Sequence, residues 1–373
     1  MNQQSLSLLR EYLKKHKTIA ALLSSAANVT WLTGYAPPIQ TGPSPFEGGP
    51  GLLWWHKGEL TLLLVDSEAA AGRSVGANVV EYSGYTVTEP LECFERQAFA
   101  LRDLLKECSS ITSTVGIEFR FLPASLVQVL RAALPNASLA AIDGDLDPLR
   151  AVKSPAEIAK ICAALELCDI GQAFIQERSK SGVSELELWG GVKAHMEVAA
   201  GVRLPVLADL VAGLRTAEIG GLPQSYVLNA GDPLLFDVVP RLDGYWGDNT
   251  GTYFVGEPSI EMKNSYKTVR ETLKRGLDAA RPGMRACDLD AMMRKSISSA
   301  GYEPYPHHTG HGIGTMYHEE PRITPYNQRI LECGMIIALE PGIYLAGSGG
   351  VRLEHVLQIT HDGCQVLTHH LID

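Results

Sequence analysis

The sequence predicts an α+β protein made of two successive domains. A chain of 373 residues is long for one hydrophobic core and of natural length for two. Helix-like and strand-like patterns alternate along both parts of the chain. The pattern Ser154-Pro-Ala-Glu157 marks the start of a helix, with Ser as N-cap, Pro at the first helical position and Glu at the third. We place the boundary just before this helix, which gives domains over residues 1–147 and 148–373.

The first of these domains is expected to be a small α/β unit. Its helices are expected at 5–17, 91–107 and 123–134, and its strands at 20–23, 52–55, 59–65 and 115–118. Lys57-Gly58 separates two of the strands and predicts a hairpin. Asn28 to Tyr35 is expected to be a turn. Residues 36–51 hold five Pro and four Gly, which predicts an irregular loop with a functional or partner-contacting role.

The second domain is expected to alternate longer helices with strand-rich stretches. The helices are expected at 154–178, 184–200, 261–281 and 286–301, and the strand-rich stretches at 232–255 and 335–360.

Composition and charge exclude several classes of function. A formal net charge of −10 argues against a nucleic-acid partner, because phosphate neutralisation needs an excess of Lys and Arg. No apolar run approaches the roughly 20 residues of a membrane helix, and Met1 to Lys17 lacks the apolar core of a signal peptide. The seven cysteines are scattered, odd in number and without a CxxC pair, which argues against a disulfide framework. These features predict a cytoplasmic protein.

Two aspartates near a hairpin signal are the first candidate metal ligands. Asp237 interrupts an apolar run, and a buried carboxylate needs a cation or another partner. If Asp243-Gly244 forms the turn, Asp237 faces Thr250 and lies diagonal to Asp248, with Cα atoms roughly 7 Å apart. Carboxylates at that spacing can hold two ions about 3.5–4 Å apart. The alternative for Asp248 is that it only caps or solvates a strand end.

Two glutamates repeat this anomaly near the C-terminus. Glu340 ends the apolar run Met335 to Leu339, and Glu354 interrupts the strand-like stretch Val351 to Ile359. Arg352 shares a face with Glu354 if that stretch is one strand, so it can steady a carboxylate that binds metal. A plain salt bridge explains Arg352 equally well.

A histidine cluster lies between these acidic stretches. His307, His308 and His311 fall within five residues beside several glycines, and His318 follows. A phosphate-binding loop is the alternative, but no Lys-Ser/Thr pair follows the glycines. Four gathered carboxylates would repel one another, and two divalent cations balance them. One imidazole with four carboxylates favours Mn²⁺, with Co²⁺ or Zn²⁺ as alternatives.

These motifs together resemble a known family. Asp237 and Asp248, the loop Gly310-His311-Gly-Ile-Gly314, Leu339-Glu340-Pro-Gly-Ile-Tyr344 and Val351-Arg-Leu-Glu354 are similar to those of the creatinase, prolidase and aminopeptidase P family, which shares its pita-bread catalytic domain with methionine aminopeptidase. The likeness covers most of the chain. It implies a creatinase-like N-terminal domain followed by a pita-bread catalytic domain.

The resemblance also implies a role for each residue of the candidate site. Asp237 would chelate one ion, His311 and Glu340 the other, and Asp248 and Glu354 would bridge them. Glu340 matches the family's general base, which relays a proton while a metal-bridging hydroxide attacks the carbonyl. His307 and His318 match histidines that line the substrate pocket and stabilise the tetrahedral intermediate. Arg322 matches an Arg that some prolidases use to bind the substrate carboxylate; a surface Arg at a strand start is the alternative.

One departure from the family concerns the substrate. Proline-specific members usually carry a His seventeen residues before the first Asp, and this sequence has Gly220 there. The family's Asp-x-Gly and Thr-Arg-Thr also read Asp237-Val-Val239 and Thr250-Gly-Thr252. These changes remove no expected metal ligand, but the missing His normally contacts the substrate backbone.

The first hypothesis is therefore a manganese- or cobalt-dependent Xaa-Pro dipeptidase or aminopeptidase that acts on short peptides. The second keeps the metals but takes a non-peptide amide or cyclic amidine, as in ectoine-hydrolase-like relatives, and the third is a non-catalytic pita-bread binding module. Family members are commonly homodimers, and the loop at 36–51, with Phe46, Trp54 and Trp55, is a candidate for contact with a second subunit.

Overall fold

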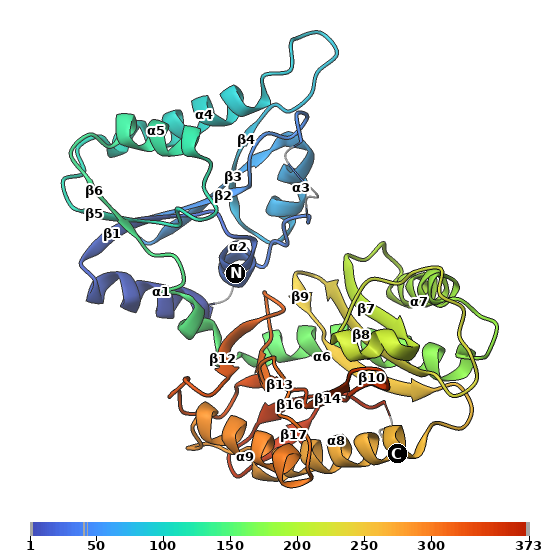
Figure 1. Ribbon diagram of the computed structural model, residues 1–373. Helices are drawn as coiled ribbons and strands as arrows, with labels where there is room; N and C mark the ends of the chain where they lie inside the picture. Colours follow the sequence, from blue (N-terminus) through green and yellow to red (C-terminus); the bar gives the residue numbers. More distant parts are fainter. Residues whose placement is uncertain (1–2, 40–41, 43, 371–373) are drawn as a thin grey trace. The chain divides into compact units, whose positions relative to one another are not determined.

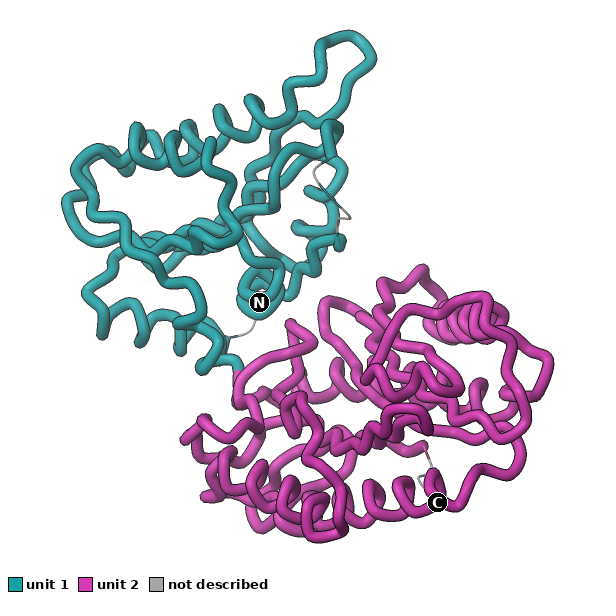
Figure 2. Tube along the Cα trace, in the orientation of Figure 1, with its two compact units in different colours: residues 1–150 teal, residues 151–373 magenta. Residues whose placement is uncertain are grey.

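The computed structural model describes residues 3–39, 42 and 44–370, and its chain divides into two units (Figure 2). Unit 1 is Met1–Arg150 and unit 2 is Ala151–Asp373. The boundary expected before Pro148 falls within the short 3-10 helix η2 (Asp147–Arg150). As predicted, both units combine helices with sheets.

Unit 1 is built on one six-stranded mixed sheet with the strand order β4-β3-β2-β1-β5-β6. Strands β1, β2 and β3 are antiparallel neighbours, and β4, β5 and β6 are added in parallel. The strands are β1 (Thr18–Leu23), β2 (Leu52–His56), β3 (Glu59–Val65), β4 (Asn78–Tyr82), β5 (Thr114–Ile117) and β6 (Ser138–Ala141).

Helices cover both faces of this sheet (Figure 1). Successive residues of β1 and β2 point to opposite faces, so Leu22 and Trp54 pack with α4 and α5, whereas Leu23 and Trp55 pack with α1 and α2. The helices are α1 (Gln3–Lys15), α2 (Ala26–Thr33), α3 (Asp66–Ser74), α4 (Cys93–Leu104), η1 (Lys106–Cys108) and α5 (Ala124–Ala133).

The expected turn at Asn28 to Tyr35 is wrong, because most of it belongs to helix α2. Ser25 caps the helix by accepting a hydrogen bond from the Asn28 amide, and Gly34 ends it with a left-handed backbone (φ 79°). The apolar Val29, Trp31 and Leu32 are buried against the sheet, so tertiary packing stabilises a helix that is short and rich in β-branched residues.

The expected role of two tryptophans in a subunit contact is also wrong. Trp54 and Trp55 lie on the central strand β2 and are only 4% and 9% exposed, because they pack into the two cores of unit 1. Phe46, by contrast, is 51% exposed. Among the described residues of the loop at 36–51, the regular pairing is limited to an isolated bridge between Ser44 and Gly48.

Unit 2 begins with the predicted helix start at Ser154. Its hydroxyl accepts the Glu157 amide and the Glu157 carboxylate accepts the Ser154 amide, so both members of the capping box are formed. The helices of the unit are α6 (Pro155–Arg178), α7 (Glu185–Ala200), η3 (Gly213–Glu218), α8 (Ile260–Ala279) and α9 (Ala286–Ser299).

The strands of unit 2 form three sheets (Figure 1). The first has the order β10-β8-β7, with β9 paired to β8, the second the order β12-β11-β13-β16-β17, and the third joins β14 to β15. The strands are β7 (Val206–Ala212), β8 (Pro233–Leu242), β9 (Tyr245–Trp246), β10 (Asn249–Phe254), β11 (Gly310–Gly312), β12 (Glu319–Ile323), β13 (Ile336–Leu339), β14 (Gly342–Leu345), β15 (Gly349–Arg352), β16 (His355–Ile359) and β17 (Cys364–Val366).

The unit therefore has two halves, each made of a helix pair and a sheet. Helices α6 and α7 pack with β7 and β8, and helices α8 and α9 share a core with β13 and β16. The halves join at β10, where the Thr250 carbonyl accepts the Glu354 amide and the Asn249 side chain donates to the Glu354 carbonyl. Among the described residues, no helix is long and apolar enough to cross a membrane.

Candidate metal centre

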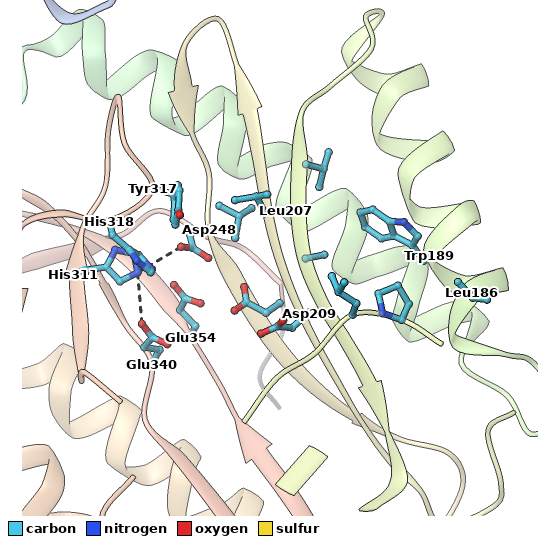
Figure 3. Close-up of a pocket in the computed structure, with 16 residues that line it drawn as sticks. Leu186, Trp189, Leu207, Asp209, Asp248, His311, Tyr317, His318, Glu340 and Glu354 are labelled. Atoms are coloured by element: carbon cyan, nitrogen blue, oxygen red, sulfur yellow. Dashed lines mark ion pairs between the residues drawn. The ribbon is translucent and has the colours of Figure 1, made fainter. Parts of the chain in front are cut away.

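The five predicted ligands all line one pocket at this junction of the two halves. Figure 3 labels four of them, Asp248, His311, Glu340 and Glu354. Asp237 lies on β8, and Asp248 occupies the short link between β9 and β10. From the other half, His311 lies on β11, Glu340 directly follows β13, and Glu354 directly precedes β16. Asp248, His311 and Glu354 are 4%, 1% and 1% exposed, so water does not stabilise their polar groups.

The register of the first two ligands follows the predicted hairpin. Asp243 and Gly244 form the turn with positive φ angles of 48° and 85°, as the tight hairpin turn of this dipeptide requires. Asp237 is therefore paired with Thr250, as predicted. Asp248 is buried near Asp237, and burial together with the neighbouring carboxylates of Glu354 and Asp237 raises the pKa of Asp248.

The continuous strand expected from Val351 to Ile359 is wrong. It divides into β15 and β16, which belong to different sheets, because the Glu354 amide donates to Thr250 on β10 instead. The side chains of Arg352 and Glu354 nevertheless both point toward the junction of the two halves. Glu354 accepts a hydrogen bond from Thr250 Oγ1 at 2.9 Å, and Arg352 donates to Asp237 Oδ2 at 2.7 Å.

His311 presents one ring nitrogen to the carboxylates. Its Nδ1 lies 3.0 Å from the Gly312 carbonyl oxygen, which fixes Nδ1 as the donor and leaves the Nε2 lone pair open. Nε2 lies 3.5 Å from both Asp248 and Glu340, which is longer than an ordinary hydrogen bond. A backbone hydrogen bond on the far nitrogen is the arrangement that orients a metal-binding histidine.

Two buried carboxylate oxygens support a cation at this place. Asp237 Oδ1 and Glu354 Oε1 accept no hydrogen bond from the part of the chain that the structure describes. Potential ligand atoms of Asp248, His311 and Glu354 all lie within 4.8 Å of one another. Because burial of bare carboxylate oxygens is costly, the donor set fits one or more oxygen-preferring cations.

The electrostatics of the polypeptide alone show the same need for positive charge. Burial, with a smaller opposing effect of Arg352, raises the pKa of Asp237 to about 6. Burial and the neighbouring carboxylates raise the pKa values of Asp248 and Glu354 well above their ordinary ranges. Without cations, the cluster therefore retains protons that metal ions would have to displace.

Glu340 is the carboxylate with the most histidine neighbours. Burial alone would raise its pKa, but the hydrogen bond from His308 and the nearby imidazoles hold the pKa below the ordinary range. His308 Nε2 lies 2.8 Å from Glu340 Oε1, and His307 Nδ1 lies 4.0 Å from Oε2. Burial lowers the pKa values of His307 to about 4 and of His318 to about 3, which keeps both rings neutral near pH 7.

His308 and Tyr344 belong to this cluster but were not among the predicted site residues. His308 also groups with His311 and His318 as a second set of potential ligand atoms within 4.8 Å. The Tyr344 hydroxyl contacts His307 Nε2 at 2.9 Å and Arg352 Nη1 at 3.3 Å. The sequence placed His308 in the histidine cluster, but it gave no sign that this ring, rather than His307, would reach Glu340.

A pocket of about 600 Å³ opens onto the carboxylates and has two chemically different sides (Figure 3). His311, His318 and the acidic residues form one side. The other side is apolar and is formed by Leu186, Trp189, Val206, Leu207, Leu222 and Pro223. Arg322 is not on the wall of this pocket; together with His307 and His308, it lines a separate hollow.

The loop that carries His318 depends on a buried ion pair. Glu319 Oε2 lies 2.9 Å from Lys153 Nζ, and both side chains are almost fully buried. Glu319 Oε1 also accepts hydrogen bonds from Thr315 Oγ1 and the Met316 amide. This carboxylate therefore closes the turn just before His318.

Replacing Glu319 with Gln should lower the free energy of unfolding by about 3–5 kcal/mol, because the buried Lys153 ammonium loses its compensating charge. Urea unfolding monitored by circular dichroism measures the change. Glu271→Gln removes one member of the exposed Lys267–Glu271 pair and should change stability by no more than about 0.5 kcal/mol. Equal effects of the two substitutions would contradict the structural role of Glu319.

Comparison with known proteins identifies the two parts of the chain. Residues 159–361 match Metallopeptidase family M24, and residues 6–152 match the Creatinase/Prolidase N-terminal domain. An Xaa-Pro dipeptidase of Pyrococcus horikoshii is 30% identical over 99% of this chain and 97% of its own length. An Xaa-Pro dipeptidase of Lactobacillus helveticus is 34% identical over 72% of this chain and 74% of its own length.

A solved structure shows the same fold over the whole length. The crystal structure of the prolidase from Pyrococcus horikoshii OT3 matches with a TM-score of 0.84 and 26% identity, covering 99% of both chains. The fold and the matched sequences thus define a metallopeptidase with a creatinase-like N-terminal domain. The chain belongs to metallopeptidase family M24, and family membership implies divalent metal ions.

Proposed function

We propose that this enzyme is a dinuclear metal-dependent peptidase that cleaves the Xaa-Pro bond of short peptides. The observation that carries the proposal is the convergence of four carboxylates and one oriented imidazole. Two oxygen atoms of these carboxylates lack a hydrogen-bond donor among the described residues. The names of the Pyrococcus and Lactobacillus relatives supply the Xaa-Pro substrate class.

The proposed metal ligands are Asp237, Asp248, His311, Glu340 and Glu354, with Asp248 and Glu354 shared between two ions. We propose Mn²⁺ for both ions, because a site with four carboxylates and one imidazole suits Mn²⁺ better than it suits metals that prefer thiolate ligands. When bound, the ions would lower the pKa of water and polarise the substrate carbonyl.

Glu340 is the proposed general base. Its carboxylate stays ionised through the His308 hydrogen bond, so it can accept a proton from the attacking water and later deliver it to the leaving nitrogen. Neutral His318 on the pocket wall can donate a hydrogen bond to the oxygen that becomes negative in the transition state. His307 Nδ1 lies 2.8 Å from the His308 carbonyl oxygen, and its Nε2 lies 2.9 Å from the Tyr344 hydroxyl. His307 stays a candidate for contact with the substrate, because it lines the hollow that it shares with His308 and Arg322.

A peptide-cleavage assay on metal-loaded and metal-depleted protein tests this proposal directly. Protein prepared with Mn²⁺ or Co²⁺ is expected to release Xaa from Xaa-Pro dipeptides or tripeptides, and protein treated with a chelator is expected to lose this activity. Amino-acid analysis of the products measures the release. Absence of cleavage in every Xaa-Pro peptide, at about two bound ions per chain, would contradict the proposed substrate.

A second candidate function follows from Gly220. Asp209 occupies the space beside this glycine and brings a carboxylate to the pocket wall. A carboxylate at that place also suits a cyclic amidine or a small amide with a cationic group. A panel of such compounds, assayed beside the dipeptides, separates the two candidates.

Oligomeric state and compartment are further parts of the proposal. Phe46 and Tyr85 are exposed and make an edge-to-face ring contact, which offers an apolar surface for a second subunit of a homodimer. Seven free cysteines favour the reducing cytoplasm. Arg322 stays a candidate for binding the substrate carboxylate, because it lines the hollow beside His307 and His308.

A further inference from the structure

Asp209 lines the pocket but belongs to none of the sequence motifs. Asp209 on β7 is the cross-strand partner of Asp237 on β8, so both side chains project from the same face of the sheet. Figure 3 shows Asp209 between the carboxylate–histidine cluster and the apolar wall. Its side chain is 37% exposed, in contrast to the buried members of the cluster.

A side chain at position 220 would overlap with the side chain of Asp209. A Cβ atom at position 220 would lie 2.0 Å from Asp209 Oδ2 and 2.6 Å from its Cγ. The three closest atoms all belong to the Asp209 side chain, so this carboxylate is the first group that a side chain at position 220 would meet. Asp209 is therefore the group that fills the place of a side chain at position 220.

The Asp209 carboxylate is held in position but can accept another hydrogen bond. Oδ1 accepts the Gly221 amide at 3.0 Å. Oδ2 lies 3.5 Å from Arg352 Nη2, which is longer than an ordinary hydrogen bond. Asp237 Oδ2 accepts a hydrogen bond from the same nitrogen at 2.7 Å. Because the guanidinium is bound mainly to Asp237, the negative charge of Asp209 is only partly compensated.

We propose that Asp209 binds the free α-ammonium group of the substrate and thereby selects peptides with an unblocked N-terminus. The inference rests on the proposed cleavage after the first residue. The Cα atom of that residue carries three groups, and the pocket offers a place for each. The scissile carbonyl faces the carboxylate–histidine cluster, the side chain faces Leu207 and Trp189, and the ammonium faces Asp209.

The central test compares wild-type enzyme with Asp209→Asn, which keeps the shape of the side chain and removes its charge. For Leu-Pro, the variant should lose about 10- to 100-fold in kcat/KM, mainly through KM, the range expected for one hydrogen bond to a charged group. For N-acetyl-Leu-Pro, kcat/KM should change little. Asp362→Asn, at an exposed turn, is the matched control and should resemble wild type for both peptides.

A binding measurement keeps this inference separate from the proposed reaction. Calorimetry on the manganese-loaded protein should show that L-leucinol binds about 10-fold or more tightly than N-acetyl-L-leucinol, and that Asp209→Asn removes the difference while metal content stays unchanged. If wild-type protein cleaves no Xaa-Pro peptide, the proposed function fails while this comparison still decides the role of Asp209. Equal binding of the two ligands, or binding of neither, overturns the role of Asp209.

The steric part of the inference has its own readout. Gly220→Ala should displace the carboxylate, lower the melting temperature and reduce the preference for L-leucinol. Adding Asp209→Ala should restore the melting temperature but not the preference. A Gly220→Ala variant that keeps both wild-type stability and the preference would contradict the mutual exclusion of the two side chains.

Discussion

Replacing Glu340 with Gln is expected to lower kcat for Xaa-Pro hydrolysis by about 10²–10⁴-fold, the usual contribution of a general base. Glutamine has the same shape, and it can keep a hydrogen bond to His308, which lies 2.8 Å from Glu340 Oε1. It cannot take a proton from water at neutral pH. The loss should therefore appear in kcat rather than in KM.

Metal analysis separates the two roles of Glu340. Four proposed ligands remain in the variant, so it should retain at least one ion per chain when it is prepared in excess Mn²⁺. Glu332→Gln, which changes an exposed carboxylate paired with Arg329, is the control and should keep wild-type kinetics. A loss of less than tenfold in a fully loaded Glu340→Gln sample would exclude Glu340 as the base.

The sequence predicted that these carboxylates and His311 lie together, because local rules fix most of their arrangement. The dipeptide Asp243-Gly244 sets the hairpin register, and the register alone pairs Asp237 with Thr250. Glu340 directly follows the apolar strand β13, so its burial follows from its neighbours in the sequence. The capping box at Ser154 marks a helix start by side-chain chemistry that acts over only three residues.

The errors arose where distant residues decide the outcome. Packing of Trp31 against the sheet makes a helix of a segment with poor helix formers. The amide of Glu354 bonds to Thr250 in the other half of unit 2, so one apparent strand becomes two. Trp54 looked available beside a Pro/Gly-rich loop, but β2 is a central strand of its sheet.

The occupant of the space at Gly220 could not be deduced for the same reason. Asp209 precedes Gly220 by eleven positions and lies on a different strand from Asp237, so no spacing rule connects it to the metal ligands. Only the pairing of β7 with β8 brings it beside Asp237.

Removing the metal is expected to destabilise the enzyme, and the effect should grow with pH. In the metal-free protein, the pKa of Asp237 is about 6, and the pKa values of Asp248 and Glu354 are raised further by burial and by like charges. The unfolded chain has ordinary carboxyl pKa values near 4. At pH values between the unfolded-state pKa near 4 and the raised native-state pKa values, the native state holds more protons than the unfolded state. The stability of the metal-free protein therefore falls as pH rises through this range.

Metal ions reverse this trend because they bind the deprotonated carboxylates. At Mn²⁺ concentrations about 100 times the dissociation constant, one site stabilises by about 2.7 kcal/mol, or about 5–10 °C in melting temperature for a unit of this size. Scanning calorimetry from pH 5 to pH 8, with Mn²⁺ or with chelator, should show the difference widening as pH rises. Binding at pH 6 should also release about one proton or more, measured by titration calorimetry in buffers of different ionisation enthalpy.

The Asp248→Asn variant shows whether the carboxylates cause this behaviour. It removes one proposed shared ligand and a buried carboxylate whose own pKa is raised by burial and by the nearby Glu354. The metal-free variant should therefore be more stable than metal-free wild type at pH 8. The same variant should gain little stability from Mn²⁺. A metal-induced stabilisation that is the same at pH 5 and pH 8, or that survives in Asp248→Asn, would mean that cations bind elsewhere. Stability and metal affinity would then be independent properties, whereas the repulsion among these buried acids predicts that they change together.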